Sequence, residues 1–268
     1  KSRVLSWMNT HANLLMCKII GLKLKKTFGG KLTFFGIGGA KLDTEVETFL
    51  LRAGFPYAVG YGLTETSPLL TFTVGKTRTP GSIGHTMKGV SLRLDNINPE
   101  TGEGEIVAKG PNVMLGYYKD PERTKKAFTE DGWFKTNDLA CLDAKGRYYI
   151  KGRLSNMILG ASGENIYPEE IEQVINGIED VDESIIVPRN GKLVALVTFN
   201  ENTIDWNQEG EDEFFRKIEA YKAKILSIVN KNVNRTSKVS DVQILKEPFE
   251  KTATRKIRRF KYLHTQGL

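Results

Sequence analysis

The hydrophobic pattern of the first eighty residues predicts strands and helices in alternation. LTFFGI (32–37) is typical of a buried strand, and DTEVETFLLRAG (43–54) predicts a helix that is capped by Asp43. PYAVGYG (56–62) predicts a second strand. This order indicates an open α/β sheet and places GYGLTETSP (60–68) where a strand ends, the edge at which such sheets bind ligands.

The pattern changes to short strands and turns between about residues 80 and 152. GVSLRLDN, EIVAKG and RYYIKG are typical of strands, and NPETGEG is typical of a turn. DPERTKKAF predicts a short helix with Asp120 as its N-cap and Pro121 at its first position. We expect a small barrel or a curved sheet in this part of the chain.

The last hundred or so residues predict a compact α+β domain. YPEEIEQVING indicates a helix that begins at Pro168, and Asn190-Gly191 is typical of a type I′ hairpin between two apolar strands. A long amphipathic helix is predicted from about Glu213 to Val233. Its apolar face would contain Phe214, Phe215, Ile218, Tyr221, Ile225 and Val229.

Composition limits the class of protein. A chain of 268 residues with 40% hydrophobic and 26% charged residues is globular and has room for one large or two modest domains. Its net charge of +7 favours anionic ligands. The two cysteines form no disulfide framework and no metal-ligand spacing, which indicates a reducing compartment. The longest apolar run, ANLLMCKIIGL, is about half a membrane span and contains Lys18, so no transmembrane segment is predicted.

The residue types in GYGLTETSP fit a nucleotide site. Its glycines allow the backbone to approach a ligand and present N–H groups to a phosphate, and Tyr61 offers a flat face to a purine. Thr64 supplies a hydroxyl, and Glu65 supplies the hard oxygen ligand that Mg²⁺ prefers. The alternative is a simple turn between two elements, since Gly, Ser and Thr are also common in turns.

Three later stretches carry further candidate residues. EDGWFKTNDL places Asp138 after an aromatic cluster, at the expected start of a strand, and KGRLSN contains Arg153. EKTATRKIRR places Lys256 in a basic segment with the composition of a mobile tail. Taken singly, such residues are more often a cap, a surface ion pair and a solvated charge.

The order of these motifs resembles that of the adenylate-forming superfamily, which includes acyl-CoA synthetases, luciferases and peptide-synthetase adenylation domains. The resemblance extends from about Lys31 onward. Within the superfamily, FGGKLTFFGIGGAKLDTEVETFL and GENIYPEEIE are most similar to bacterial long-chain fatty acid–CoA ligases. The five motifs that carry the resemblance are GYGLTETSP, GEGEIVAKGPNVMLGYYKDPERT, DGWFKTNDL, GRLSNMILGASGENIYPEEIE and EKTATRKIRR.

The resemblance implies a two-step reaction that activates a carboxylic acid, with a long-chain fatty acid as the expected substrate. ATP and Mg²⁺ serve the first step, which gives an acyl-adenylate, and CoA is the co-substrate of the second step. By resemblance, Glu65 holds Mg²⁺, Thr64 contacts the α-phosphate, and Tyr61 with Gly62 lies beside the adenine. The GYGLTETSP segment would thus hold AMP.

Further roles follow from the same resemblance. Gly38, Gly39 and Ala40, in GIGGAKL, match the loop on the other side of the adenine. Asp138 matches the carboxylate that accepts both ribose hydroxyls, and Arg153 is expected to reach the same ribose.

Lys256 matches the lysine that bridges carboxylate and phosphate in the first step only. The resemblance implies that the domain beyond Arg153 rotates between the two steps, with Ser155 as the hinge and the GASGEN hairpin near the path of the thiol. From the residues alone, the GRLSN junction fits either an inert spacer or such a hinge.

The implied fold class is α/β plus α+β. Residues 1–152 would be the C-terminal part of a large AMP-binding domain, with a sheet at about 31–79 and a β-rich, barrel-like subdomain at about 80–152. Residues 153–268 would be a small, mobile C-terminal domain.

The sequence departs from the family pattern at several places. The loop that grips the β- and γ-phosphates is absent, so we expect it upstream of Lys1 and expect this C-terminal portion to be inactive alone. Asn137 and Arg255 replace glycines, and Ser155 stands where Asp or Lys is usual. These departures affect how the hinge is biased and how Lys256 approaches AMP.

Other functions fit the same residues less well. A nucleic-acid-binding module is disfavoured because the basic residues form no recognition-helix or aromatic-interleaved pattern, so no nucleic-acid partner is expected. A non-catalytic AMP-binding scaffold is disfavoured, because a scaffold would not need the catalytic residues that the resemblance implies. An adenylating enzyme for an aromatic carboxylate or a carrier-protein-loaded amino acid is the alternative among enzymes. The expected location is cytoplasmic, with peripheral contact at the inner membrane surface as a variant.

Overall fold

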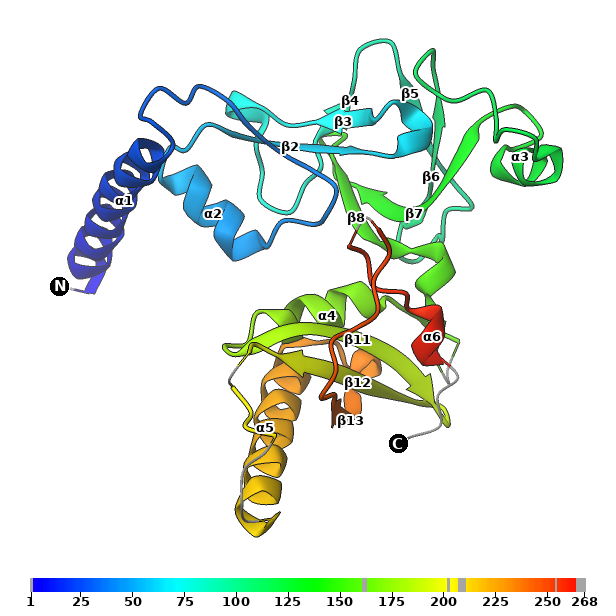
Figure 1. Ribbon diagram of the computed structural model, residues 1–268. Coiled ribbons are helices and arrows are strands. Elements are labelled where there is room, and N and C mark those ends of the chain that lie inside the picture. Colours follow the sequence, from blue (N-terminus) through cyan, green and yellow to red (C-terminus); the bar gives the residue numbers. More distant parts are fainter. Residues whose placement is uncertain (1, 161–162, 202, 207–210, 254, 264–268) are drawn as a thin grey trace. The chain divides into compact units, whose positions relative to one another are not determined.

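The computed structural model describes most of the chain and shows two compact units, Lys1–Ile150 and Lys151–Leu268 (Figure 1). Each unit has its own sheets and its own apolar core. The described residues are 2–160, 163–201, 203–206, 211–253 and 255–263.

The first unit begins with a long helix and a four-stranded sheet. β1 and β2 run parallel, while β2, β3 and β4 are joined antiparallel. The helix between β1 and β2 provides the crossover that a parallel pair requires. The elements are α1 (Ser2–Thr27), β1 (Phe35–Ile37), α2 (Thr44–Arg52), β2 (Tyr57–Gly62), β3 (Leu69–Phe72) and β4 (His85–Thr86).

The predicted helix after β1 is confirmed, together with its cap. Asp43 Oδ1 accepts hydrogen bonds from the N–H groups of Glu45 and Val46, both at 2.9 Å, which satisfies N–H groups that have no partner inside the helix. Gly54 follows the helix with a φ of +67°, a conformation that glycine adopts without steric cost. Local sequence signals therefore fix both ends of α2.

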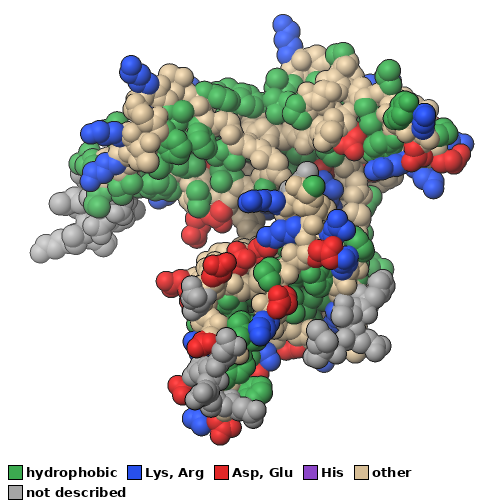
Figure 2. Space-filling view, in the orientation of Figure 1, with side chains coloured by type: hydrophobic (Ala, Val, Ile, Leu, Met, Phe, Trp, Pro, Cys, Tyr) green, Lys and Arg blue, Asp and Glu red, His purple; other side chains and the backbone are tan. Residues whose placement is uncertain are grey.

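α1 presents apolar side chains to solvent. Its described side chains include six large exposed hydrophobic residues, and Figure 2 shows apolar side chains gathered at this end of the first unit. Among the helices of the described residues, none is long and apolar enough to cross a membrane. The six residues are Leu14, Leu15, Met16, Ile19, Ile20 and Leu22.

A second sheet of four strands completes the first unit. Its order is β5-β6-β7-β8, and the edge strands β5 and β8 do not pair with each other in the described part of the chain. The strands therefore form a sheet and not the closed barrel that was one of the two expectations. The predicted helix α3 (Pro121–Ala127) is confirmed, with Asp120 Oδ1 accepting from the N–H of Arg123 at 3.0 Å. The strands are β5 (Ser91–Asp95), β6 (Gly104–Lys109), β7 (Phe134–Leu142) and β8 (Tyr148–Arg153).

The second unit is built on a three-stranded sheet with one long hairpin. Asn190 and Gly191 join β11 and β12 with φ values of +48° and +71°, which confirms the predicted type I′ turn. β12 also pairs in parallel with β13. The elements are β9 (Ile158–Leu159), β10 (Asn165–Ile166), α4 (Pro168–Asn176), β11 (Val181–Arg189), β12 (Lys192–Phe199), α5 (Glu211–Asn232), β13 (Val239–Ile244) and α6 (Phe260–Leu263). Part of the GASGEN segment, which was expected near the thiol path, lies outside the described residues.

The two faces of this sheet are covered by different segments. One face packs against α4 and α5, which contribute Ile175, Ile225 and Val229 to a shared core. The other face packs against the C-terminal segment, through Phe249 and the partly buried Ile257. The predicted apolar face of α5 is wrong at Phe215, which is 59% exposed, because the helix buries its apolar residues only toward its C-terminal half.

A buried ion pair fixes the C-terminal segment to the rest of the second unit. Arg259 Nη1 and Nη2 contact the two carboxylate oxygens of Glu172, each at 2.6 Å. Glu172 Oε1 also accepts from the N–H of Ile186 at 2.6 Å, so one carboxylate joins α4, β11 and the C-terminal segment.

Replacing Arg259 with Met tests this attachment. The substitution leaves the Glu172 carboxylate buried without its guanidinium, which costs about 3–5 kcal/mol. We therefore expect a matching fall in the free energy of unfolding, measured by urea denaturation. The double variant Glu172→Met/Arg259→Met should recover most of the loss. Arg258→Met, at a more exposed ion pair, should cost less than about 1 kcal/mol. Equal losses at Arg258 and Arg259 would contradict the anchoring role.

Candidate functional site

Two predicted loops lie side by side at the carboxyl ends of β1 and β2. Ile37 pairs with Val59, so the loop containing Gly38, Gly39 and Ala40 leaves the sheet beside Gly60. A Cβ atom on Gly38 would lie only 3.1 Å from the carbonyl oxygen of Gly60. The structure thus brings GIGGAKL next to GYGLTETSP, although the two are far apart in sequence.

GYGLTETSP joins β2 to β3 in a tight antiparallel connection. Gly62 pairs with Leu69, and a Cβ atom at Gly62 would lie 1.7 Å from the carbonyl oxygen of Pro68. No other residue fits there. Thr66 is fully buried, and its hydroxyl accepts from the N–H of Leu63 at 3.0 Å and donates to the carbonyl of Pro68. The segment is therefore a turn, as the simpler interpretation held, and a rigid one.

The rigid turn determines where its polar side chains point. Thr64 begins the 3₁₀ turn Thr64–Thr66 and is exposed, whereas Glu65 is partly buried. Tyr61 Oη donates a hydrogen bond to Asp138 Oδ2 at 2.8 Å, across 77 positions of sequence. This bond brings the GYGLTETSP and DGWFKTNDL motifs together in one place.

Asp138 lies inside β7, not at the start of a strand as predicted, and is only 6% exposed. Its N–H donates to Thr136 Oγ1 at 3.1 Å, and that hydroxyl donates to the carbonyl of Ile106 at 2.7 Å. These contacts hold the backbone of Asp138 against the neighbouring strand β6. The carboxylate is therefore preorganised and accepts a hydrogen bond from Tyr61.

Asn137 has the left-handed conformation that glycine favours. Its φ is +63°, at a position where the resembling family usually has glycine. The N–H of Asn137 donates to Glu105 Oε1 at 3.0 Å, and Glu105 is buried. The backbone geometry is thus kept although the residue differs, because Asn tolerates this region better than most residues do.

Glu65 has a partner from a different part of the chain. Tyr117 Oη donates to Glu65 Oε1 at 3.0 Å, and the guanidinium carbon of Arg123 lies 4.0 Å from the centre of the Tyr117 ring. Burial, followed by the hydrogen bond to Glu65, raises the pKa of Tyr117. The tyrosine hydroxyl therefore stays protonated and donates to the carboxylate.

The donor set at Glu65 fits a magnesium ion shared with a phosphate ligand. The described residues contain no group of three or more His, Cys, Asp or Glu side chains that could hold a metal by themselves. Mg²⁺ in nucleotide enzymes is typically held by one or two carboxylates together with substrate phosphates. Glu65 is a single, partly exposed carboxylate of this kind.

The remaining predicted residues lie in the second unit. Arg153 ends β8 and is exposed, and Ser155 lies in the following 3₁₀ turn Leu154–Asn156, also exposed. Both residues make polar interactions.

Lys256 lies on a turn that is hydrogen-bonded to Thr252. The N–H of Thr252 donates to the carbonyl of Lys256 at 2.8 Å, and the N–H of Lys256 donates to Thr252 Oγ1 at 3.1 Å. Arg255, which also replaces a family glycine, has a φ of +60° in this turn. The lysine side chain is exposed.

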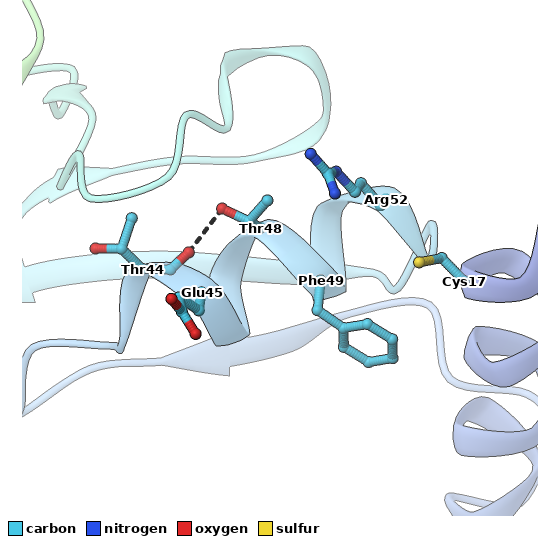
Figure 3. A pocket seen from close by; sticks show the side chains of 6 residues that line it. All are labelled: Cys17, Thr44, Glu45, Thr48, Phe49 and Arg52. Atoms are coloured by element: carbon cyan, nitrogen blue, oxygen red, sulfur yellow. Dashed lines mark hydrogen bonds between the residues drawn. The ribbon is translucent and has the colours of Figure 1, made fainter. Parts of the chain in front are cut away.

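A hollow of about 340 Å³ lies between α1 and α2, away from these residues (Figure 3). Its lining contains Cys17 from α1 and Thr44, Thr48 and Arg52 from α2, and it includes none of the site residues predicted from sequence. Thr48 donates to the carbonyl of Thr44 within the helix at 2.7 Å.

Sequence reasoning missed the residues that support the site. Tyr117, Glu105 and Thr136 received no role, because their partners are distant in sequence or are backbone groups. Thr66 was expected to offer its oxygen to a ligand, but it is fully buried and its hydroxyl closes the turn. A signal was present for all four, since each lies in one of the five motifs that carried the family resemblance.

Comparison with known proteins finds relatives among AMP-binding enzymes. The model of the family described as AMP-binding enzyme matches residues 3–118. A long-chain-fatty-acid–[acyl-carrier-protein] ligase, AEE15 of Arabidopsis thaliana, is 30% identical over 281 residues, covering 96% of this chain and 38% of the relative. The long-chain-fatty-acid–CoA ligase FadD15 of Mycobacterium bovis is 27% identical, covering 90% of this chain and 42% of the relative.

Solved structures show the same fold. ATP-bound MatB from Rhodopseudomonas palustris aligns with a TM-score of 0.68 at 29% identity, over 89% of this chain and 46% of that chain. The Bacillus subtilis o-succinylbenzoate CoA synthetase in complex with its acyl-adenylate aligns with a TM-score of 0.73 at 21% identity, which supports the fold alone.

The chain is therefore related to the adenylate-forming, AMP-binding enzymes, as its motifs predicted. It spans 38–42% of the length of the first curated relatives that it matches. Those relatives are named as ligases of fatty acids or as an acyl-activating enzyme.

The left-handed Arg255 gives a stability test. A residue with a Cβ atom costs about 1–2 kcal/mol in this conformation, and glycine loses about 0.5–1 kcal/mol in extra chain entropy. We expect Arg255→Gly to raise the free energy of unfolding by about 0.5–1 kcal/mol in urea denaturation. Arg255→Ala keeps the Cβ atom and removes the charge, so it should show no such gain. A gain of equal size in both variants would assign the effect to charge.

Proposed function

We propose that this chain is the AMP-binding portion of a longer ligase that activates a carboxylic acid and transfers the acyl group to CoA. The proposed acid is a long-chain fatty acid. The observation that carries the proposal is the hydrogen bond from Tyr61 to Asp138. It joins two of the five motifs at the sheet edge where the loop 38–40 also emerges.

The proposed chemistry converts a poor electrophile into a good one. A carboxylate oxygen attacks the α-phosphorus of ATP, pyrophosphate leaves, and an acyl-adenylate forms. The sulfur of CoA then attacks the acyl carbon, AMP leaves, and the thiol proton passes to solvent. Phosphoryl transfer of this kind depends mainly on alignment and on neutralisation of charge.

Each site residue of the first unit has a part in holding the nucleotide. Gly38, Gly39 and Ala40 would flank the adenine on one side, and Tyr61 and Gly62 on the other. The exposure of the loop 38–40 and the close backbone approach at Gly62 support these roles.

The sugar and phosphates fall to three polar side chains. Asp138 would accept the two ribose hydroxyls, for which its preorganised carboxylate is suited. Thr64 would contact the α-phosphate, and Glu65 would hold Mg²⁺, whose charge offsets that of the phosphates.

The second unit would rotate between adenylation and thioester formation and so supply different residues to each step. We assign it to the small mobile domain, with Arg153 at the ribose and Ser155 at the hinge. Lys256 would stabilise the negative charge of the first transition state. The loop for the β- and γ-phosphates would belong to the part of the longer protein that this chain does not contain, and a cytoplasmic location completes the proposal.

The acid itself has a second candidate class. Fatty acids appear in the names of several relatives, including human long-chain-fatty-acid–CoA ligase 1, which is 32% identical over 206 residues. The 2-succinylbenzoate–CoA ligase of Enterococcus faecalis is 33% identical over 197 residues, which favours an aromatic acid as the alternative. ATP–pyrophosphate exchange with a panel of acids would separate the two.

Asp138→Asn in the longer protein tests the ribose assignment. The amide is close in shape to the carboxylate and can still accept from Tyr61, but it lacks the charge. Because hydrogen bonds to a charged group contribute about 1.5–3 kcal/mol, AMP affinity should fall about tenfold or more in calorimetry. Tyr61→Phe keeps the aromatic ring and removes only the hydrogen bond to Asp138, so it measures separately what that internal bond contributes to AMP affinity. Unchanged AMP affinity in Asp138→Asn would make Asp138 a purely structural residue.

Lys256→Ala tests the division of labour between the two steps. Loss of one preorganised charge should slow adenylation about 10²- to 10³-fold, while ATP binding changes far less. Thioester formation from pre-made acyl-adenylate and CoA should be nearly intact, because the lysine would have moved away by then. Arg255→Ala, on the same turn, is the matched control. If both half-reactions slowed equally, Lys256 would be a general structural anchor.

A further inference from the structure

The loop that precedes α3 is fixed to the GYGLTETSP turn by hydrogen bonds to the backbone of the turn. The N–H of Met114 donates to the carbonyl of Glu65 at 2.8 Å. Asn112 Nδ2 donates to the carbonyls of Thr66 at 2.7 Å and Leu69 at 3.1 Å. Residues 112–117 therefore follow the turn wherever it lies, independently of any single side-chain contact to the Glu65 carboxylate.

The ring of Tyr117 is itself held in place by α3. The N–H of Tyr117 donates to Thr124 Oγ1 at 2.9 Å, and Arg123 stacks on the ring with its guanidinium carbon 4.0 Å from the ring centre. A Cβ atom on Gly116 would lie 2.6 Å from Thr124 Cγ2, so the chain approaches α3 as closely as glycine permits. The tyrosine hydroxyl consequently has a defined position relative to Glu65.

A fixed donor changes what a carboxylate can do. A glutamate on a turn explores many rotamers, and each must be given up when a cation binds. The Tyr117 hydroxyl engages Oε1, which restricts the side chain before any ligand arrives and leaves Oε2 without a bond to that hydroxyl. Partners of this kind orient metal ligands and tune their affinity.

We propose that Tyr117 is a positioning residue for the Glu65 carboxylate and sets the affinity of the site for the divalent cation that accompanies ATP. This inference rests on the proposed function, in which Glu65 holds the cation. It adds a residue from a separate segment, 52 positions away, and it predicts that α3 is part of the nucleotide site.

Tyr117→Phe in the longer protein tests the inference with a readout other than activity. Binding of Mn²⁺ in the presence of ATP, followed by electron paramagnetic resonance, should weaken about tenfold, the lower end of the effect of losing such a partner. The Mg²⁺ concentration that half-saturates ATP–pyrophosphate exchange should rise by a similar factor. The rate at saturating Mg²⁺ and the thioester half-reaction should stay close to those of the unmodified protein.

The neighbouring tyrosine provides a matched control. Tyr118 is 88% exposed, and Lys119 lies over its ring. Tyr118→Phe therefore makes the same chemical change at the next residue of the loop and should leave cation binding unchanged. Melting temperatures of the two variants should agree, because the hydrogen bonds from Met114 and Asn112 to the turn remain.

Glu65→Gln separates failure of this inference from failure of the proposed function. If Glu65→Gln leaves Mn²⁺ binding unchanged, Glu65 is not the cation ligand and the proposed role itself is wrong. If Glu65→Gln weakens binding and Tyr117→Phe does not, Tyr117 has no positioning role. Equal slowing of both half-reactions by Tyr117→Phe, with a lower melting temperature, would also overturn the inference, because the tyrosine would then act on stability alone.

Discussion

The close backbone approach at Gly62 is the constraint on which the candidate site depends. Because Gly62 has no Cβ atom to meet the carbonyl of Pro68, β2 can turn directly into β3. The turn then points Thr64 to solvent and Glu65 toward Tyr117, while Tyr61 reaches Asp138 on the other sheet. One steric condition thus sets the directions of several chemically different side chains, which a flexible loop could not do.

The site is supported by buried polar groups that have no chemistry of their own. Glu105 holds the backbone of Asn137, Thr136 holds that of Asp138, and Thr66 closes the turn. Since an unsatisfied buried polar group costs free energy, each of these groups also ties the site to the stability of the first unit. Binding geometry and folding are therefore coupled through the same hydrogen bonds.

Local elements were predictable from the sequence, and long-range contacts were not. The α2 cap at Asp43, the α3 cap at Asp120 and the Asn190-Gly191 turn depend on residues within a few positions, and all three were confirmed. The left-handed backbone at Asn137 was not predictable from that residue type, because its support comes from Glu105, 32 positions away. The burial of α5 was overestimated at Phe215, because periodicity does not say how far along a helix the neighbouring sheet extends.

The C-terminal segment of the second unit has a consequence for synthesis of the chain. This segment packs against an apolar cluster on one face of the three-stranded sheet, including Ile185, Val187 and Leu196, and it also carries Lys256. A chain interrupted before Phe249 would display that apolar face and become a target for aggregation or for chaperones. The residues that cover the apolar face and Lys256 belong to the same segment. Chaperones and proteases that recognise exposed apolar surface would therefore also remove interrupted chains that lack the lysine.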